Sequence, residues 1–91
     1  MSNVAADQVL DALGLRCPLP VLKARKALSA LAAGQVLEVL ANDPAAPEDF
    51  AALCQVTGHR LVAQTWDGGA HRFLIVSAGP SPRPGPEAED S

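Results

Sequence analysis

The chain has 91 residues, which is enough for one small domain with one modest core. Apolar residues make up 48% of the sequence and charged residues 19%, a balance that is typical of globular proteins. The net charge of −3 and the aromatic share of 3% argue against a basic, base-stacking surface, so we expect no direct contact with nucleic acid.

The first half of the chain predicts a strand, a helix and a second strand. We expect residues 1–7 to form a flexible lead-in and residues 8–13 to form a strand. A helix is predicted over residues 18–33, because proline is tolerated in a first helical turn and Gly34 can end the helix. A strand over residues 35–41 follows.

The second half predicts one more helix and a hairpin. The helix is expected over residues 47–57. Strands over residues 59–65 and 70–77 are joined by a tight turn at residues 66–69, where Asp-Gly-Gly is typical of a hairpin. Alternating prolines followed by acidic residues indicate a disordered, Pro-rich acidic tail over residues 79–91.

The order β-α-β-α-β-β predicts an α/β (α+β) two-layer sandwich, in which two helices cover one face of a four-stranded mixed sheet. The folded domain is expected to span residues 8–78. The chain has no apolar run of the roughly 18 residues that span a bilayer, and residues 1–8 lack the pattern of a signal peptide. We therefore expect a cytoplasmic protein without membrane contact, whose cysteines, Cys17 and Cys54, are thiols.

Cys17 is the strongest candidate for a reactive residue. It lies between Arg16 and Pro18, directly before the predicted first helix. The positive end of the helix dipole and the Arg16 guanidinium both favour a thiolate, so we predict a lowered pKa for Cys17. Pro18 and Pro20 should stiffen the backbone around it. The alternative is that Cys17 is a small buried hydrophobic residue.

Several kinds of cysteine chemistry fit the sequence poorly. A dithiol oxidoreductase needs a Cys-x-x-Cys pair, and this segment reads Cys-Pro-Leu-Pro. A cysteine hydrolase needs a base, and the sequence places neither His59 nor His71 near Cys17. A zinc site made of these residues and Cys54 lacks paired-ligand spacing, so we expect no metal, and we expect no cofactor. A persulfide carrier needs only an exposed, ionised thiol and a docking surface.

The predicted first helix offers such a surface. Leu19 and Leu22 fall opposite its apolar stripe, where they are either a docking patch or ordinary exposed leucines. Arg25 flanks the stripe and either contacts a partner or lies along the surface. The stripe that should face the sheet consists of Val21, Ala24, Leu28, Leu31 and Ala32.

Other polar positions have structural interpretations. Cys54 should pack in the core on the inner face of the second helix. Asp43 should cap that helix or form the turn before it. His59 and His71 are expected at the surface or at a sheet edge.

The segment Leu10–Leu28, with its Cys-Pro-x-Pro motif, resembles the signature of the TusA/SirA-like sulfur-carrier family. The likeness continues through the turn at residues 42–45 and covers roughly residues 9–76. The Pro-rich tail and Asn42 depart from the family pattern. The resemblance implies the β-α-β-α-β-β sandwich and a persulfide on the motif cysteine, which is Cys17 here.

The resemblance also implies a sulfurtransferase in the broad sense, a persulfide carrier and not an enzyme with its own turnover. Cys17 would accept sulfur from a cysteine desulfurase or a rhodanese-type donor. It would pass the sulfur to an acceptor protein in tRNA thiolation, molybdenum-cofactor formation or sulfur oxidation. Leu22, Arg25 and Asp43 fall on the family's partner-contact positions, and Leu19 would extend that face. The alternative function is a regulatory or binding module in which Cys17 is structural or a redox sensor.

Overall fold

The structure is a computed structural model that describes residues 6–79. Its elements follow in the predicted order: β1 (Gln8–Asp11), α1 (Leu19–Ser29), β2 (Val36–Ala41), α2 (Ala46–Thr57), β3 (Arg60–Asp67) and β4 (Ala70–Val76). The expected tail over residues 79–91 lies outside the described residues except for Gly79, as do residues 1–5 of the expected lead-in. The domain limits at residues 8 and 78 therefore stay a prediction.

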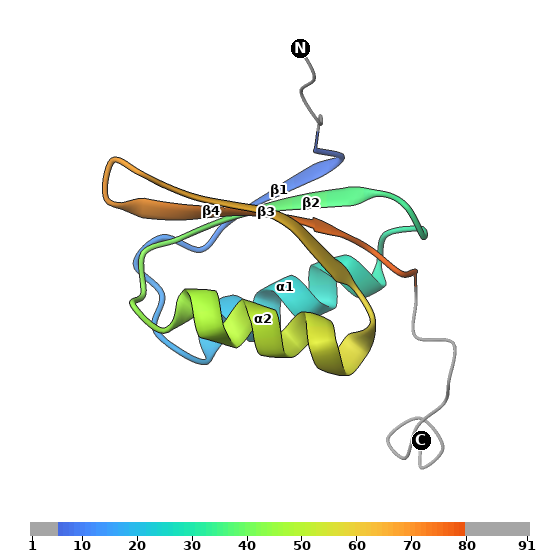
Figure 1. Cartoon of the computed structure of the whole chain (residues 1–91), viewed down its shortest axis with the longest axis horizontal. Helices are drawn as coiled ribbons and strands as arrows, with labels where there is room; N and C mark the ends of the chain where they lie inside the picture. Colours follow the sequence, from blue (N-terminus) through green and yellow to red (C-terminus); the bar gives the residue numbers. More distant parts are fainter. Residues whose placement is uncertain (1–5, 80–91) are drawn as a thin grey trace.

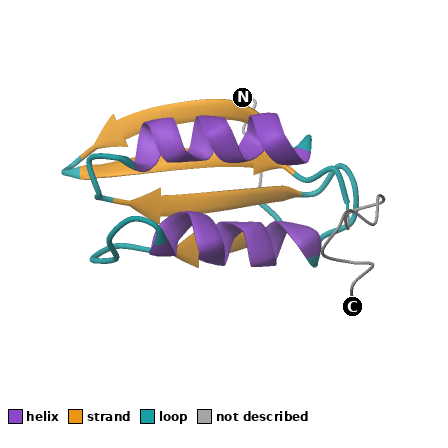
Figure 2. Cartoon of the chain, turned by 90° about the horizontal axis from the view of Figure 1, so that it is seen from below, coloured by secondary structure: helices purple, strands orange, loops and turns teal. Residues whose placement is uncertain are grey.

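The four strands form one mixed sheet in the order β1-β2-β4-β3. β1 pairs with β2 in parallel, while β4 is antiparallel to both β2 and β3. Both helices lie against the same face of this sheet (Figures 1 and 2). The predicted two-layer sandwich with two helices on one face is confirmed.

The core lies between the sheet and the two helices. Alternate residues of β2 and β4 point toward the helices, as the period of two in a strand requires. Phe50 of α2 packs on Phe73 of β4 with ring centroids 4.7 Å apart. Each large side chain removed from water here stabilises the fold by about 1.5–3 kcal/mol. The largest fully buried side chains are Phe50, Phe73, Leu28, Leu37, Ile75 and Val39.

The first helix is shorter than predicted, because its last turn tightens into bonds from the N–H groups of Ala30 and Leu31 to carbonyls three residues back. α1 ends at Ser29, whereas the sequence predicted a helix to residue 33. The Leu28 carbonyl accepts the N–H of Leu31 at 3.1 Å in this last turn, and the buried hydroxyl of Ser77 donates a second hydrogen bond to it at 2.9 Å. Gly34 adopts φ 92° in the following turn, where its N–H donates to the carbonyl of Ser77.

Other element limits also differ from the prediction, most of them by one residue. β1 ends at Asp11 and not at residue 13, because the carboxylate of Asp11 accepts the N–H of Leu13 and turns the chain. β3 extends to Asp67, and the hairpin turn is confined to Gly68 and Gly69, which both have positive φ. No helix within residues 6–79 has both the length and the apolar character needed to cross a membrane.

Candidate functional site

Cys17 lies in the connection between β1 and α1 and is a free, exposed cysteine. Pro18, which follows it through a cis peptide bond, is the N-cap residue of α1. The carbonyl of Arg16 accepts the N–H of Leu19 at 2.8 Å, which continues the turn into the helix. The alternative of a buried Cys17 is therefore wrong, and the thiol stands at the beginning of α1.

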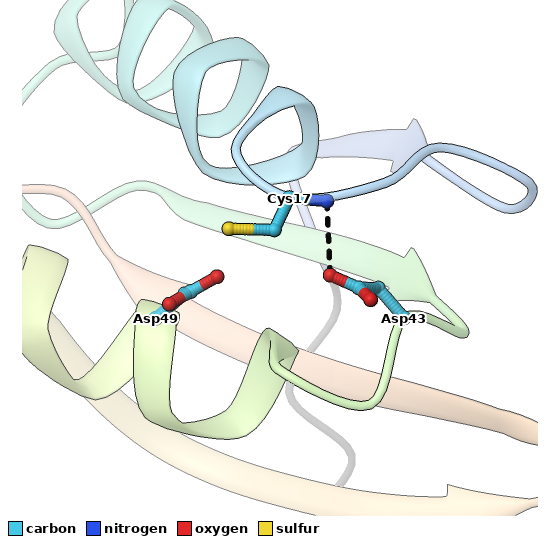
Figure 3. A group of neighbouring side chains, drawn as sticks. All are labelled: Cys17, Asp43 and Asp49. Atoms are coloured by element: carbon cyan, nitrogen blue, oxygen red, sulfur yellow. Dashed lines mark hydrogen bonds between the residues drawn. The ribbon is translucent and has the colours of Figure 1, made fainter.

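Asp43 fixes the backbone of Cys17 from the other side of the site. Its Oδ2 accepts the N–H of Cys17 at 3.0 Å, across 26 residues of sequence (Figure 3). Next to it, the side chain of Asn42 accepts the N–H of Gly14 at 2.9 Å. Asp43 is only 9% exposed, and its side chain makes no cap to α2, although its carbonyl accepts the N–H of Ala46 in the turn. The turn interpretation of Asp43 is confirmed, and the cap interpretation is wrong.

Asp49 is the third member of the site, and the sequence analysis did not name it. The sulfur of Cys17 and one carboxylate oxygen each from Asp43 and Asp49 all lie within 4.8 Å of one another. Figure 3 shows the Cys17 thiol and the Asp49 carboxylate turned toward each other. The available signal was the parallel pairing of β1 with β2, because the helices after two parallel strands begin at the same end of the sheet.

The two carboxylates reverse the predicted electrostatics of Cys17. The Asp49 carboxylate, which faces the thiol as a hydrogen-bond acceptor, raises the pKa of Cys17 most, followed by desolvation and by the negative charges of Asp49 and Asp43. The predicted lowering by Arg16 and the helix dipole is wrong. Pro18 and Pro20 lack the N–H groups that would otherwise favour a thiolate at the start of α1.

The other predicted site residues lie on α1 or directly before it and differ in how exposed they are. Leu19 and Leu22 are 45% and 52% exposed, so both present apolar surface beside the site. Arg25 is also exposed, and its charge adds to the effect of burial in lowering the pKa of His59. Pro18 is exposed, whereas Pro20 belongs to the buried face of α1. Of the predicted stripe, Ala24, Leu28 and Leu31 are buried, Val21 is half-buried and Ala32 is exposed.

The remaining cysteine and the histidines lie elsewhere. Cys54 is half-buried against the core, as predicted, and burial raises its pKa. His59 is only 7% exposed, and its Nδ1 accepts the N–H of Ala78 at 2.9 Å, so it is not at the surface. It directly precedes β3, an edge strand of the sheet, in agreement with the alternative of an edge position. His71 is half-buried on the inner strand β4, with its ring 4.5 Å from that of Trp66. Within residues 6–79, neither histidine joins the one group of possible metal ligands, which is formed by Cys17 and the two aspartates.

A family model and two sequence relatives match most of this chain. The family model described as sulfurtransferase TusA matches residues 8–77. The chain is 51% identical over 69 residues to the sulfur carrier protein TusA of Allochromatium vinosum, which covers 76% of this chain and 91% of that protein. It is 46% identical to a putative sulfur carrier protein of Neisseria meningitidis serogroup A, with 76% and 93% covered.

A solved structure agrees as well. The crystal structure of a SirA-like protein from Desulfitobacterium hafniense superposes with a TM-score of 0.70 at 32% identity and covers 78% of this chain and 97% of that one. The fold and the exposed cysteine at the start of α1 therefore define a small two-layer sandwich protein of the SirA-like class. Within that class, the chain belongs to the sulfurtransferase TusA family, and the family resemblance of the sequence is confirmed.

Proposed function

We propose that the protein is a sulfur carrier that holds a persulfide on Cys17. The observation that carries this proposal is the exposed, free thiol at the beginning of α1, in a chain that belongs to the TusA family. Cys54 is half-buried and packs against the core, so it is a poor second candidate. The Asp43 carboxylate supports the role, because its hydrogen bond to the Cys17 N–H holds the loop that presents the thiol.

The reaction is an exchange between persulfides and thiols. The sulfur of Cys17 attacks the terminal sulfur of a persulfide on the donor, a new S–S bond forms, and the donor's S–S bond breaks. The proton of the Cys17 thiol ends on the donor sulfur that leaves, so the donor becomes a thiol and no electrons are gained or lost overall. An acceptor thiol then takes the terminal sulfur by the same exchange, and Cys17 returns to a thiol.

Family membership implies a sulfur donor and a sulfur acceptor in general. We propose a cysteine desulfurase or a rhodanese-type protein as the donor, and an acceptor in tRNA thiolation, molybdenum-cofactor formation or sulfur oxidation. The relay would operate in the cytoplasm, where thiols remain reduced.

The docking face would include Leu19, Leu22 and Arg25, which are exposed on α1, the helix that begins after Cys17. Asp43 contributes to this face through the loop that it holds in place, since it is nearly buried itself. Arg16, Pro18 and Pro20 would support the site through the backbone of the turn into α1. A small surface of mixed polarity suits a transient contact.

The test is the intact mass of the protein after incubation with a cysteine desulfurase and L-cysteine. Wild type should gain the mass of one sulfur atom, and a thiol reductant should remove it. Cys17→Ser should gain nothing, whereas Cys54→Ser serves as the matched control and should load like wild type.

If Cys17→Ser loads as well as wild type, the proposal is wrong. If the folded wild type gains no sulfur from a desulfurase, a rhodanese or inorganic polysulfide, the regulatory or binding module becomes the better interpretation.

A further inference from the structure

The charges around Cys17 are unusual for an exposed thiol that must react. Both charged groups that shift the pKa of Cys17 are carboxylates: Asp49 from α2 and Asp43 from the connection between β2 and α2. Within residues 6–79 neither of them has a cationic partner at ion-pair distance, because the ion pair in this part of the chain joins Arg72 to Glu38. Arg16 precedes Cys17 in the sequence and is exposed, yet its positive charge does not offset the effect of the two carboxylates on the pKa of Cys17.

The two carboxylates have different tasks. Asp43 is engaged by the N–H of Cys17, and this bond fixes the backbone. Asp49 accepts no backbone N–H within the described residues, and its carboxylate is turned toward the sulfur (Figure 3). Asp49 is therefore the group that is free to accept the hydrogen of the thiol.

We propose that Asp49 controls the reactivity of Cys17 by accepting the thiol hydrogen and holding the empty carrier as a neutral thiol. This inference rests on the proposed function, because it concerns the cysteine that would carry the sulfur. The thiolate is the nucleophile in thiol–disulfide exchange, so a neutral Cys17 reacts slowly with disulfides met at random. With glutathione disulfide, Cys17 would form an S–S bond to one glutathione while the other glutathione leaves as a thiol. A carrier blocked in this way cannot accept sulfur, and Asp49 slows the reaction that blocks it.

The test compares Asp49→Asn with wild type in the rate of alkylation by iodoacetamide as a function of pH. The Cys17 peptide is followed by mass spectrometry, so that alkylation of Cys54 does not interfere. Asp49→Asn should react faster near neutral pH, by about threefold for each tenfold rise in the thiolate fraction, because a less basic thiolate is also a weaker nucleophile. At high pH, where Cys17 is a thiolate in both proteins, Asp49→Asn should react more slowly than wild type, because its thiolate is the weaker nucleophile.

Glu48→Gln is the matched control, because it removes the same charge from the same turn of α2 at an exposed position. It should alkylate like wild type. Coinciding profiles for Asp49→Asn and wild type would overturn the proposal, and so would an equal change in Glu48→Gln, which would assign the effect to the charge of the helix end.

A second measurement needs no variant. In wild type, the pH midpoint of Cys17 alkylation should be higher in the folded protein than in the urea-unfolded chain, and an equal or lower midpoint in the folded protein refutes the proposal. These alkylation profiles are independent of sulfur loading. Failure of the carrier function would appear as absent loading with the profiles unchanged, whereas failure of the Asp49 role would leave loading on Cys17 intact.

Discussion

Replacing Asp43 with alanine removes the hydrogen bond that ties the Cys17 loop to the turn before α2. The bond is charge-assisted, 3.0 Å long and partly buried, and its acceptor is only 9% exposed. Hydrogen bonds to charged groups contribute about 1.5–3 kcal/mol. We therefore expect Asp43→Ala to lower the free energy of unfolding by about 2 kcal/mol. For a domain of this size, such a loss lowers the Tm by about 8–16 °C.

Two variants make this reasoning specific. Asp43→Asn keeps an oxygen acceptor without the charge, so it should lose about half as much stability. Asp11→Ala is the matched control, because Asp11 also accepts a backbone N–H at 3.0 Å, but from an exposed residue two positions away. Water can replace that bond, so the expected loss is below about 0.5 kcal/mol.

The assay is urea unfolding followed by circular dichroism, with the Tm as a second measure. The reasoning is refuted if Asp43→Ala is as stable as wild type, or if it loses no more than Asp11→Ala. Either result would mean that the contact with the Cys17 N–H does not hold the loop.

Three further outcomes are expected. Because burial and the charge of Arg25 lower the pKa of His59 in the folded state, the unfolded chain binds more protons below about pH 6.5. The free energy of unfolding measured by urea titration should therefore fall as the pH drops through about 6.5 toward the lower pKa of the folded state. His59→Gln should flatten this dependence, and an unchanged slope contradicts the reasoning. Leu22→Ser should slow sulfur loading by a donor protein but not by inorganic polysulfide, and it should change the free energy of unfolding by less than about 0.5 kcal/mol. The exposed control Val56→Ser should slow loading by neither donor. Equal slowing of Leu22→Ser with both donors rules out a docking role. Arg72→Ala should lower the free energy of unfolding by less than about 1 kcal/mol, because the Arg72 side chain is 53% exposed and water screens its charge. Urea unfolding at low and high salt measures this loss, and a loss that is larger at high salt than at low salt contradicts the reasoning.

Local patterns were sufficient to predict the fold class, the order of the elements and the exposure of Leu19 and Leu22. Alternation along β2 and β4 and the turn at Gly68 and Gly69 are properties of short segments. The end of α1 was predicted wrongly, because the chain closes the helix with short-range bonds at Ala30 and Leu31, before it reaches Gly34.

In the candidate site, too, local features were predicted correctly and features that depend on distant residues were not. Cys17 could be predicted from its motif and its position before α1, because both are local. The direction of its pKa could not, since Asp43 and Asp49 approach it only when α2 packs beside α1 on the sheet. The burial of His59 was missed for a similar reason, because its partner Ala78 lies beyond two intervening strands.

The most direct measurement of the central claim is peptide mass spectrometry of the protein after loading by a cysteine desulfurase, with persulfides trapped by alkylation. We predict one additional sulfur atom on the peptide that contains Cys17 and an unmodified thiol on the peptide that contains Cys54. Additional sulfur on the Cys54 peptide instead, or a loaded protein whose Cys17 peptide carries none, would contradict the account.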